Sequence, residues 1–520
     1  MANQQKENQF CDSGDVPGQF CPVIIKWGRY WRYAGLAVLV MLLSSCGKSA
    51  SESDGAKSTN NASLRNDVST TDDGQKADDV KSDTVEVKKS LFHPSSQTTS
   101  DGQLVSLDEY ASIEDCARCH KRIGKEWKGS MHSAGFSDPF FRALYHMASE
   151  DTDGKTDKLC MGCHSSPLVL SGHGENSGLD QFKSPVSDGI SCVVCHFIDG
   201  SNLASKEELP ANASFVADPK GPIHGPHAER RCLHRGRATV ASKQMRSSKF
   251  CGNCHRVVHP NNGLVVDRTY EEWLGSIYAE KGIQCQDCHM RPVKLAIETA
   301  RTLKKINNPG RATEKSPMRD HISSHYFVGA NTAITKLQGA DEHAAMAEEL
   351  LKSAASLKLI FPEQITPGKE TEFDVRVTNE TAGHNLPTSL TEVRQMWLDV
   401  EITDADGKEV FRSGAIDENG KIDPDAIMFH SVGIDEQGNE TIKPWQMVKF
   451  ISFHTIPPRD SLLEHYKFAV PKKITGPLQV RVTLRYRSYS QKLARLLLGD
   501  DTPVVPVVNM VSIMQTLETP

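Results

Sequence analysis

The spacing of apolar and polar residues changes several times along the chain. Residues 34–43 form a short, continuous apolar run. Residues 46–105 are dominated by Ser, Thr, Asp, Asn and Lys and hold few large apolar side chains. Such a segment cannot bury enough apolar surface to offset the entropy lost on ordering. We therefore expect a disordered tether over residues 46–105.

Between residues 106 and 335, short apolar runs alternate with Gly, Pro and polar stretches, which predicts a loop-rich, mainly α region. Helical spacing is clearest at 121–129, 137–149 and 270–280. Residues 336–356 are rich in Ala, Glu, Leu and Lys, which are strong helix formers. They predict a connecting helix.

Beyond residue 357 the period of the pattern becomes two. Apolar residues alternate with polar ones at 373–377, 396–402 and 478–486, as in half-buried strands. An Asp-Gly turn within 404–411 predicts a hairpin. The predicted fold is therefore multidomain, with a mainly α domain at 106–335 followed by an all-β sandwich over 357–520.

Composition excludes one class of partner. The net charge of the 520 residues is −6, and no strongly basic block occurs, so nucleic acid is not an expected partner. The unusual numbers are 14 Cys and 20 His, and these residues are grouped rather than spread evenly. Their grouping decides the functional interpretation.

The first 45 residues are typical of an export signal. Basic residues precede the apolar run, and the pattern L-S-S-C-G follows it. The run is about half of the ~20 residues that a membrane-spanning helix needs. The pattern resembles the bacterial lipobox, which implies that Cys46 carries a lipid and that, with Gly47 next, the anchor lies in the outer membrane. An ordinary signal peptide or an uncleaved anchor, with an incidental cysteine, is the alternative.

The pattern C-x-x-C-H occurs five times. Chance alone would give roughly 0.01 matches at this composition. The cysteines are Cys116 and Cys119, Cys160 and Cys163, Cys192 and Cys195, Cys251 and Cys254, and Cys285 and Cys288. The following histidines are His120, His164, His196, His255 and His289.

This is the attachment pattern of c-type haem. The two thiols add to the two vinyl groups of the haem, and the adjacent histidine becomes the proximal iron ligand. Zinc does not require a histidine after every cysteine pair, and a thioredoxin-like redox site would be a single motif. We expect five covalent haems, packed as their own core because only about 35 residues serve each. The remaining Cys232 is either a buried inert thiol or a reactive one.

The distal ligand of each iron decides whether a haem only transfers electrons or also admits substrate. The histidines of the haem segment outside the motifs are His132, His146, His173, His224, His227, His234, His259, His321 and His325. Five haems need at most five of them. The pair His224 and His227 stands in a Gly/Pro loop, where we expect one or both to ligate, and His259 is either a ligand or a surface residue.

Several stretches resemble the multihaem c-type cytochromes of the cytochrome c-554 and hydroxylamine-oxidoreductase-like group, over roughly residues 113–330. The carriers are W-K-G-S-M-H (127–132), D-G-I-S-C-V-V-C-H (188–196), G-P-I-H-G-P-H (221–227), C-G-N-C-H (251–255), E-W-L-G-S-I-Y (272–278), C-Q-D-C-H-M (285–290) and S-H-Y-F-V-G (324–329). The resemblance implies that His132 and His325 are the leading distal ligands. His146, His173, His234 and His321 are weaker candidates.

The stretch T-A-G-H-N-L-P-T-S, 381–389, resembles the G-H-x-x-P-T loop of β-sandwich domains that follow such cytochromes. His384 in this loop either crosses to a haem as its distal ligand or bonds within its own loop. We expect His430, His454 and His465 to be ordinary sandwich residues.

The resemblance implies either an electron carrier or an oxidoreductase. No C-x-x-C-K motif occurs, so the nitrite-reducing enzymes with a lysine proximal ligand lose support. We expect an exported, lipid-anchored pentahaem cytochrome that relays electrons between redox protein partners and needs no catalytic residue. The alternative is an oxidoreductase with one open haem that acts on a small nitrogen or sulfur species.

Overall fold

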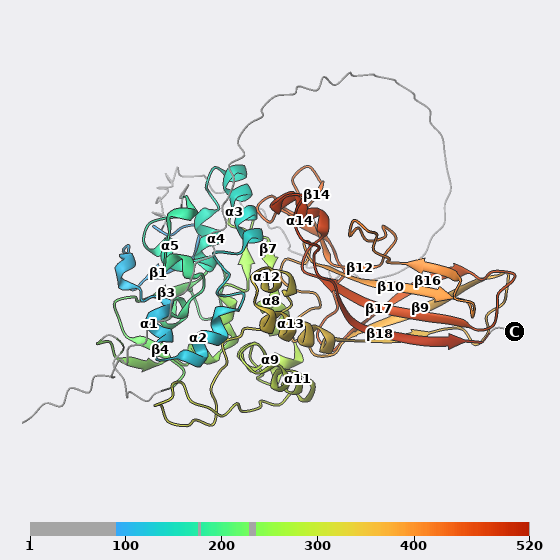
Figure 1. Ribbon diagram of the computed structural model, residues 1–520. Coiled ribbons are helices and arrows are strands. Elements are labelled where there is room, and N and C mark those ends of the chain that lie inside the picture. The colour runs from blue at the N-terminus through green and yellow to red at the C-terminus, as the bar shows by residue number, and fades with distance from the viewer. Residues whose placement is uncertain (1–89, 175–177, 228–233, 235, 519–520) are drawn as a thin grey trace, which may run out of the picture. The chain divides into compact units, whose positions relative to one another are not determined.

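The computed structural model describes residues 90–174, 178–227, 234 and 236–518 (Figure 1). They belong to a compact unit that runs from Val85 to Pro520. The predicted export signal, Cys46 and Cys232 lie outside the described residues. We call residues 90–354 the motif-bearing part and residues 355–518 the two-sheet part.

The motif-bearing part consists of short helices joined by loops, as the sequence predicts. Its α-helices are α1 (Ile113–Ala117), α2 (Lys121–Lys128), α3 (Pro139–Thr152), α4 (Asp157–His164), α5 (Ser166–Leu170), α6 (Cys192–His196), α7 (Ser248–Gly252), α8 (Thr269–Leu274), α9 (Ile277–Glu280), α10 (Gln286–His289), α11 (Val293–Thr302), α12 (Thr332–Leu337) and α13 (Asp341–Ser353). Its strands are β1 (Thr98–Thr99), β2 (Ile198–Ser201), β3 (Phe215–Ala217), β4 (Ile223–Gly225), β5 (Thr239–Ala241), β6 (Val257–Val258) and β7 (Val265–Asp267).

Local sequence explains where these helices begin and end. Ser112 and Asp115 form a capping box on α1. Asp138 caps α3 with Pro139 at its first position, and the left-handed Asp153 ends that helix. The helix expected over 270–280 is broken into α8 and α9, because the Ser276 hydroxyl caps a new helix by accepting from the Ala279 N–H. The connecting helix is α13.

The predicted tether is too long at its C-terminal end. Phe92 and Gln97 are each about 1% exposed, and β1 pairs in parallel with β3. Phe92 joins an apolar cluster that includes Met161 and Leu168. Because the stretch is polar on average, its composition does not reveal these few buried side chains. The packed part of the chain therefore begins before residue 106.

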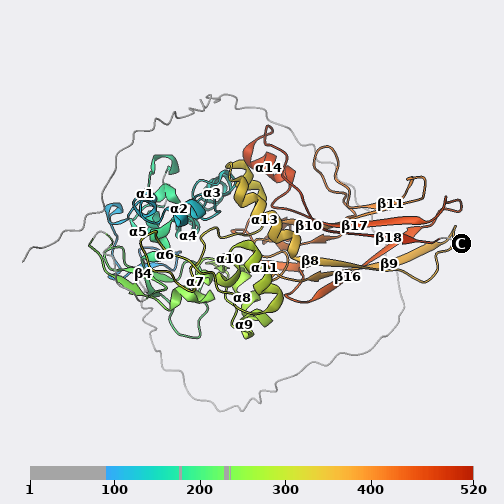
Figure 2. The same cartoon turned by 60° about the horizontal axis from the view of Figure 1, so that its bottom comes forward.

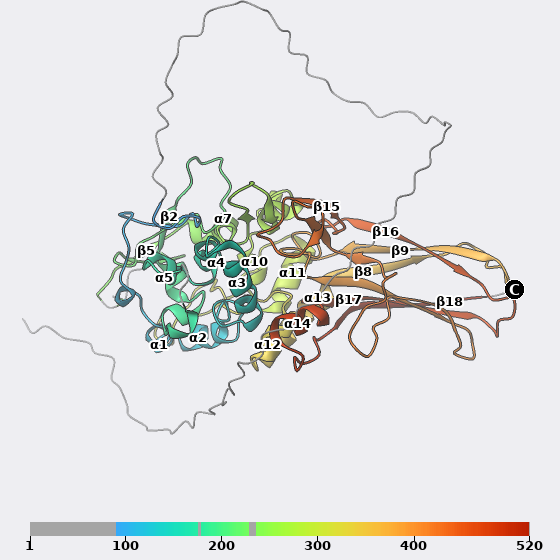
Figure 3. The same ribbon diagram turned by 90° about the horizontal axis from the view of Figure 1, so that it is seen from above.

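The two-sheet part contains two antiparallel sheets that share one apolar core. One sheet has the order β11-β10-β17-β18, with β12 beside β10, and the other has the order β16-β9-β8 (Figures 1 and 3). A small third sheet has the order β14-β13-β15. The strands are β8 (Ala355–Ile360), β9 (Glu370–Asn379), β10 (Gln395–Thr403), β11 (Glu409–Ser413), β12 (Met428–Phe429), β13 (Ser431–Ile434), β14 (Glu440–Thr441), β15 (Lys449–Phe453), β16 (Ser461–Ala469), β17 (Leu478–Arg487) and β18 (Val508–Leu517). One helix, α14 (Gln491–Leu498), interrupts the strands.

The shared core follows from the alternation seen in the sequence. Val375 and Val377 of β9 face Val400 of β10 and Val482 of β17 across the core, and all four are fully buried. The predicted hairpin at 404–411 joins β10 to β11, and the Asp404 carboxylate accepts the N–H groups of residues 406 and 408 in its turn. The period-two prediction is thus confirmed at the level of strands.

The two parts meet through polar contacts from loops of the two-sheet part. Asp151 at the end of α3 accepts hydrogen bonds from Lys443 (2.8 Å), Trp445 (2.8 Å) and Gln446 (3.3 Å). A second contact joins Asn262 Nδ2 to the Met447 carbonyl at 2.8 Å. One short loop of the two-sheet part therefore binds two segments of the motif-bearing part.

Helix α13 packs against both α11 and α12, and its end leads directly into β8 (Figure 2). Within the described residues, no helix combines the length and apolarity needed to cross a membrane.

Candidate haem sites

Each C-x-x-C-H motif forms about one helical turn. The histidine N–H donates to the carbonyl of the first cysteine at 3.0 Å in the motifs of His120 and His255, and at 2.9 Å in that of His289. The motifs of His164 and His196 lie within α4 and α6. Residues at i, i+3 and i+4 share one helix face, so the two thiols and the imidazole can address one planar group.

Main-chain carbonyls orient four of the five motif histidines. The Nδ1 atom of each lies within hydrogen-bonding distance of a carbonyl oxygen. The pairs are His120 with Ala312 (3.0 Å), His164 with Gly135 (2.8 Å), His196 with His224 (2.6 Å) and His289 with Val328 (2.6 Å). A bonded Nδ1–H fixes the tautomer and leaves the Nε2 lone pair free for a metal. These residues thus fit haem ligation.

Three motif histidines face a second histidine ring at a characteristic separation. The ring centres are 6.1 Å apart for His120 and His234, 6.4 Å for His255 and His132, and 6.2 Å for His289 and His384. Two imidazoles on opposite sides of one metal should have centres about 6.3 Å apart, since each nitrogen lies about 2.0 Å from the metal. All three pairs match this spacing.

His325 lies near His196, a motif histidine outside the three pairs. Burial lowers the pKa of His325 to about 3, and the electrostatic effect of the neighbouring His196 lowers it further. The Nδ1 atoms of His325 and His132 are buried without a hydrogen-bond partner.

The motif of His164 differs from the others. Phe141 stacks flat on the His164 ring, with centres 3.6 Å apart and planes at 3°. That separation is too short for a metal between the rings. His164 is not a member of the three histidine pairs at this spacing.

Three buried imidazoles near the motifs are neutral near pH 7. Burial lowers the pKa of His132 to about 3, and the pKa values of His164 and His384 to about 4. A neutral imidazole keeps the lone pair that binds a metal. The described residues contain no cluster of three or more His, Cys, Asp or Glu suited to a lone metal ion.

The thiols of different motifs lie close to one another. Cys116 raises the pKa of Cys192 by hydrogen bonding to it, as Cys163 does for Cys254 and Cys285 for Cys251. Cys254 also raises the pKa of Cys195 electrostatically. The five motifs therefore form one connected cluster, with the Cys251–His255 motif beside three others.

The remaining distal candidates have other surroundings. His224 points its Nε2 toward Asp199 (3.4 Å), while its carbonyl orients His196. His259 uses both ring nitrogens within the protein, on the Trp445 carbonyl (3.2 Å) and the Asn261 N–H (3.3 Å). Both ring nitrogens of His259 are therefore engaged within the protein, whereas the Nε2 of His224 is buried without a hydrogen-bond partner and its role as a ligand stays a prediction.

His227 lies close enough to His321 to lower the pKa of that ring, and its role as a ligand stays a prediction. His321 contacts Arg291 (2.6 Å) and accepts from the Asn308 N–H (3.1 Å). His173 contacts the Ser171 hydroxyl at 3.0 Å, and His146 is exposed. In the two-sheet part, His454 and His465 bond to Glu464 and Asp374.

The loop of His384 reaches from the two-sheet part to helix α8. Glu272 accepts hydrogen bonds from the Asn385 N–H (3.1 Å) and the Thr388 hydroxyl (2.6 Å). Asp267 accepts from the Ser389 hydroxyl at 2.8 Å. The Nδ1 of His384 contacts the carbonyl of Asn385 at 2.8 Å, so the ring bonds within its own loop while its Nε2 stays available to a metal.

His234, which the sequence gives only as a weaker candidate, has the spacing of a ligand, and its role stays a prediction. It pairs with His120 at an interplanar angle of 6°, while its Nδ1 lies 3.2 Å from the Thr239 hydroxyl. It lies more than a hundred residues from His120, and no neighbouring motif distinguishes it from the other surplus histidines.

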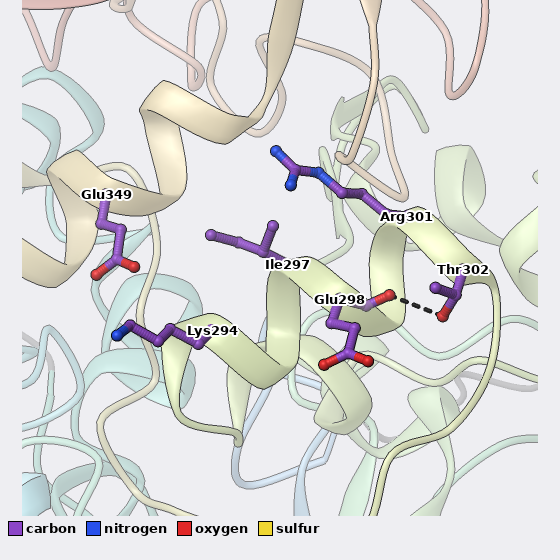
Figure 4. Close-up of a pocket in the computed structure, with 6 residues that line it drawn as sticks. All are labelled: Lys294, Ile297, Glu298, Arg301, Thr302 and Glu349. Carbon is purple, nitrogen blue, oxygen red and sulfur yellow. Dashed lines mark hydrogen bonds between the residues drawn. The ribbon is translucent and has the colours of Figure 1, made fainter.

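A shallow groove of about 350 Å³ lies elsewhere, on α11 and α13 (Figure 4). Its lining comprises Lys294, Ile297, Glu298, Arg301, Thr302 and Glu349. None of these belongs to a motif or to a histidine pair, so the groove is separate from the candidate haem sites.

The comparisons agree with the motifs. Residues 115–197 match the family described as cytochrome c554 and c-prime. No curated protein sequence matches the chain. The penta-heme cytochrome c552 from Thermochromatium tepidum has a similar structure, at 19% identity and a TM-score of 0.56, covering 79% of this chain and 99% of that one.

A second solved structure, the CARDB domain of the PF1109 protein from Pyrococcus furiosus, matches at 10% identity and a TM-score of 0.16. The match covers 32% of this chain and 87% of that one. The family match and the motifs together support a multihaem c-type cytochrome with covalently bound haem c.

Proposed function

We propose that this chain is an exported pentahaem cytochrome that relays electrons between redox proteins. The observation that carries the proposal is the set of three histidine pairs at bis-imidazole spacing, 6.1 to 6.4 Å. Two imidazoles close both faces of an iron and suit it to electron transfer rather than to substrate binding. The similarity to a penta-heme cytochrome supports the count of five.

The proposed proximal ligands are the five motif histidines. The proposed distal ligands are His234 opposite His120, His325 opposite His196, His132 opposite His255, and His384 opposite His289. Haem supplies reversible one-electron storage, and the residues around it supply the rest. They fix the imidazole orientation, exclude water, and keep neighbouring motifs close.

The location and partners follow from the N-terminal sequence. Export, cleavage before Cys46 and lipidation there would place the protein on the outer membrane, facing the periplasm or the cell surface. The tether would then let the folded part reach redox partners, one of which we expect to be a membrane complex. The two-sheet part is proposed to be a β-sandwich that closes the haem site of His289 through His384.

Electron paramagnetic resonance of the oxidised, full-length protein tests the relay. If four haems have both faces closed, at least four of the five ferric signals should be low-spin. The same signals should return after one cycle of reduction and reoxidation. Two or more high-spin haems would contradict the proposed ligand set. His173→Ala protein should give the same signals as the unaltered protein, because His173 faces no motif histidine in the described ring contacts.

A second candidate function rests on the surroundings of His164. The motif of His164 is the one for which we propose no distal ligand, so its haem would be the candidate for an open face. The protein would then act as an oxidoreductase on a small nitrogen or sulfur species. A change in one high-spin signal on adding nitrite or hydroxylamine would support this activity. If no signal changes, the electron relay is the one proposal that stands.

A further inference from the structure

A seven-residue pattern occurs twice in the motif-bearing part. Residues 126–132 read E-W-K-G-S-M-H, and residues 272–278 read E-W-L-G-S-I-Y. The pattern Gly-Ile-x-Cys also occurs twice, at 189–192 and at 282–285, where it opens two of the haem motifs.

The two tryptophans make the same contact. Trp127 Nε1 donates to the Ile190 carbonyl at 2.8 Å, and Trp273 Nε1 donates to the Ile283 carbonyl at 2.9 Å. Each isoleucine lies two residues before the first cysteine of a motif. The tryptophans therefore hold the chain that enters the motifs of His196 and His289.

The rest of the pattern is also equivalent in structure. The Ser130 hydroxyl accepts from the N–H of residue 133 at 3.3 Å, and the Ser276 hydroxyl accepts from the N–H of residue 279 at 3.5 Å. Gly189 and Gly282 have φ values of 63° and 70°, a conformation that glycine adopts without strain. The two copies thus share these hydrogen bonds and the positive φ of the glycine before the motif, although a helix follows the serine only in the second copy.

The two glutamates also make the same kind of contact. Glu126 accepts the N–H of His325 at 2.9 Å, and Glu272 accepts the N–H of Asn385, next to His384, at 3.1 Å. These bonds join residues that are 199 and 113 positions apart. Each carboxylate thus holds the main chain that carries a distal histidine.

We propose that each Glu-Trp dipeptide is an axial clamp for one haem. In each copy the tryptophan fixes the proximal side of a haem, and the adjacent glutamate fixes the distal loop of the same haem. Glu126 and Trp127 serve the haem of His196, and Glu272 and Trp273 serve the haem of His289. The inference rests on the proposed distal ligands His325 and His384, and the glutamates are positioning residues.

The last residue of the pattern shows that clamping is separate from ligation. His132 in the first copy faces His255. Tyr278 in the second copy instead donates to the Ala300 carbonyl at 3.1 Å and accepts from Arg459 Nε at 3.1 Å. The two copies keep the contacts of Glu, Trp, Gly and Ser while this position changes its role.

The clamp is tested in the full-length, haem-loaded protein with Glu272→Ala and Glu126→Ala. We expect each variant to gain a high-spin ferric signal of at least half a haem equivalent, because a loosened loop lets the distal imidazole leave the iron. Glu272→Gln should restore the low-spin signal, since its amide oxygen can accept the Asn385 N–H. Glu271→Ala is the matched control. It removes the neighbouring carboxylate, which accepts from Arg256 Nε at 2.8 Å rather than from the loop of His384.

A second readout follows the main chain directly. Hydrogen exchange of the Asn385 amide should quicken on the order of 10-fold in Glu272→Ala, because a half-buried hydrogen bond is lost. The double variant Glu272→Ala with His384→Ala should show no more high-spin haem than His384→Ala alone.

The variants His384→Ala and His325→Ala test the proposed distal ligands separately from the glutamates that would position them. If neither single variant creates a high-spin haem, the ligand assignment is wrong. If both do while the glutamate variants keep every haem low-spin and Asn385 exchange is unchanged, the ligands stand and the clamp is wrong.

Discussion

Replacing His234 with alanine tests a distal ligand that we propose from ring spacing and that the sequence gives only as a weaker candidate. The ring centres of His234 and His120 lie 6.1 Å apart and their planes differ by 6°, which places His234 opposite one motif histidine alone. Removing it should open one iron, so on the order of one fifth of the total haem should change from low to high spin. The Thr239 hydroxyl should lose its imidazole partner without further rearrangement.

The assay is quantitative electron paramagnetic resonance of the oxidised protein, with intact mass to show that all haems are attached. His321→Ala is the control, because His321 contacts Arg291 and the Asn308 N–H rather than a motif histidine. An unchanged spectrum for His234→Ala at full haem content would refute the geometric argument from ring spacing. A change of two haems would refute the one-to-one pairing.

Three further predictions concern stability. Asp151→Ala should lower the free energy of unfolding by about 1–2 kcal/mol in urea titrations, because three hydrogen bonds to the two-sheet part are lost, whereas Glu150→Ala should change it little. Burial raises the pKa of Glu392 to about 8 from 4.5, so its contribution to stability is present below about pH 4.5 and is lost as the pH rises toward 8. The stability of Glu392→Gln relative to the unaltered chain should therefore increase by about 3–4 kcal/mol between pH 5 and pH 8, and a constant difference would contradict the buried, unpaired carboxylate. Gly135→Ala should cost about 1 kcal/mol and alter the spectrum of the haem of His164, since the added carbon would crowd the carbonyl oxygens of His132 and His164 at 3.2 and 3.3 Å and the Gly135 carbonyl orients His164. Unchanged thermal unfolding would argue against this packing.

Much of the fold follows from local pattern. Period-two alternation predicts β9, β10 and β17, and the Asp-Gly turn predicts the β10–β11 hairpin, because these strands bury one face against a shared core. Helices α2 and α3 were also predicted within a few residues. The tether boundary was not, because Phe92 anchors the chain in a segment whose average composition is polar.

For the candidate haem sites too, local features are predictable from the sequence and long-range partners are not. The motif cysteines and histidines are separated by fixed, short intervals, so sequence alone identifies them. Distal ligands are long-range partners, and nothing local distinguishes His234 from His259, which instead docks on the Trp445 carbonyl. The repeated Glu-Trp pattern is visible in the sequence, but its role depends on contacts more than a hundred residues away.

The count of electrons that one chain can store tests the central claim most directly. Coulometric titration of the purified, haem-loaded protein should take up five electrons per chain, one for each motif, and return all five on reoxidation. Fewer than five would show that one or more motifs carry no working haem, and would contradict a pentahaem relay.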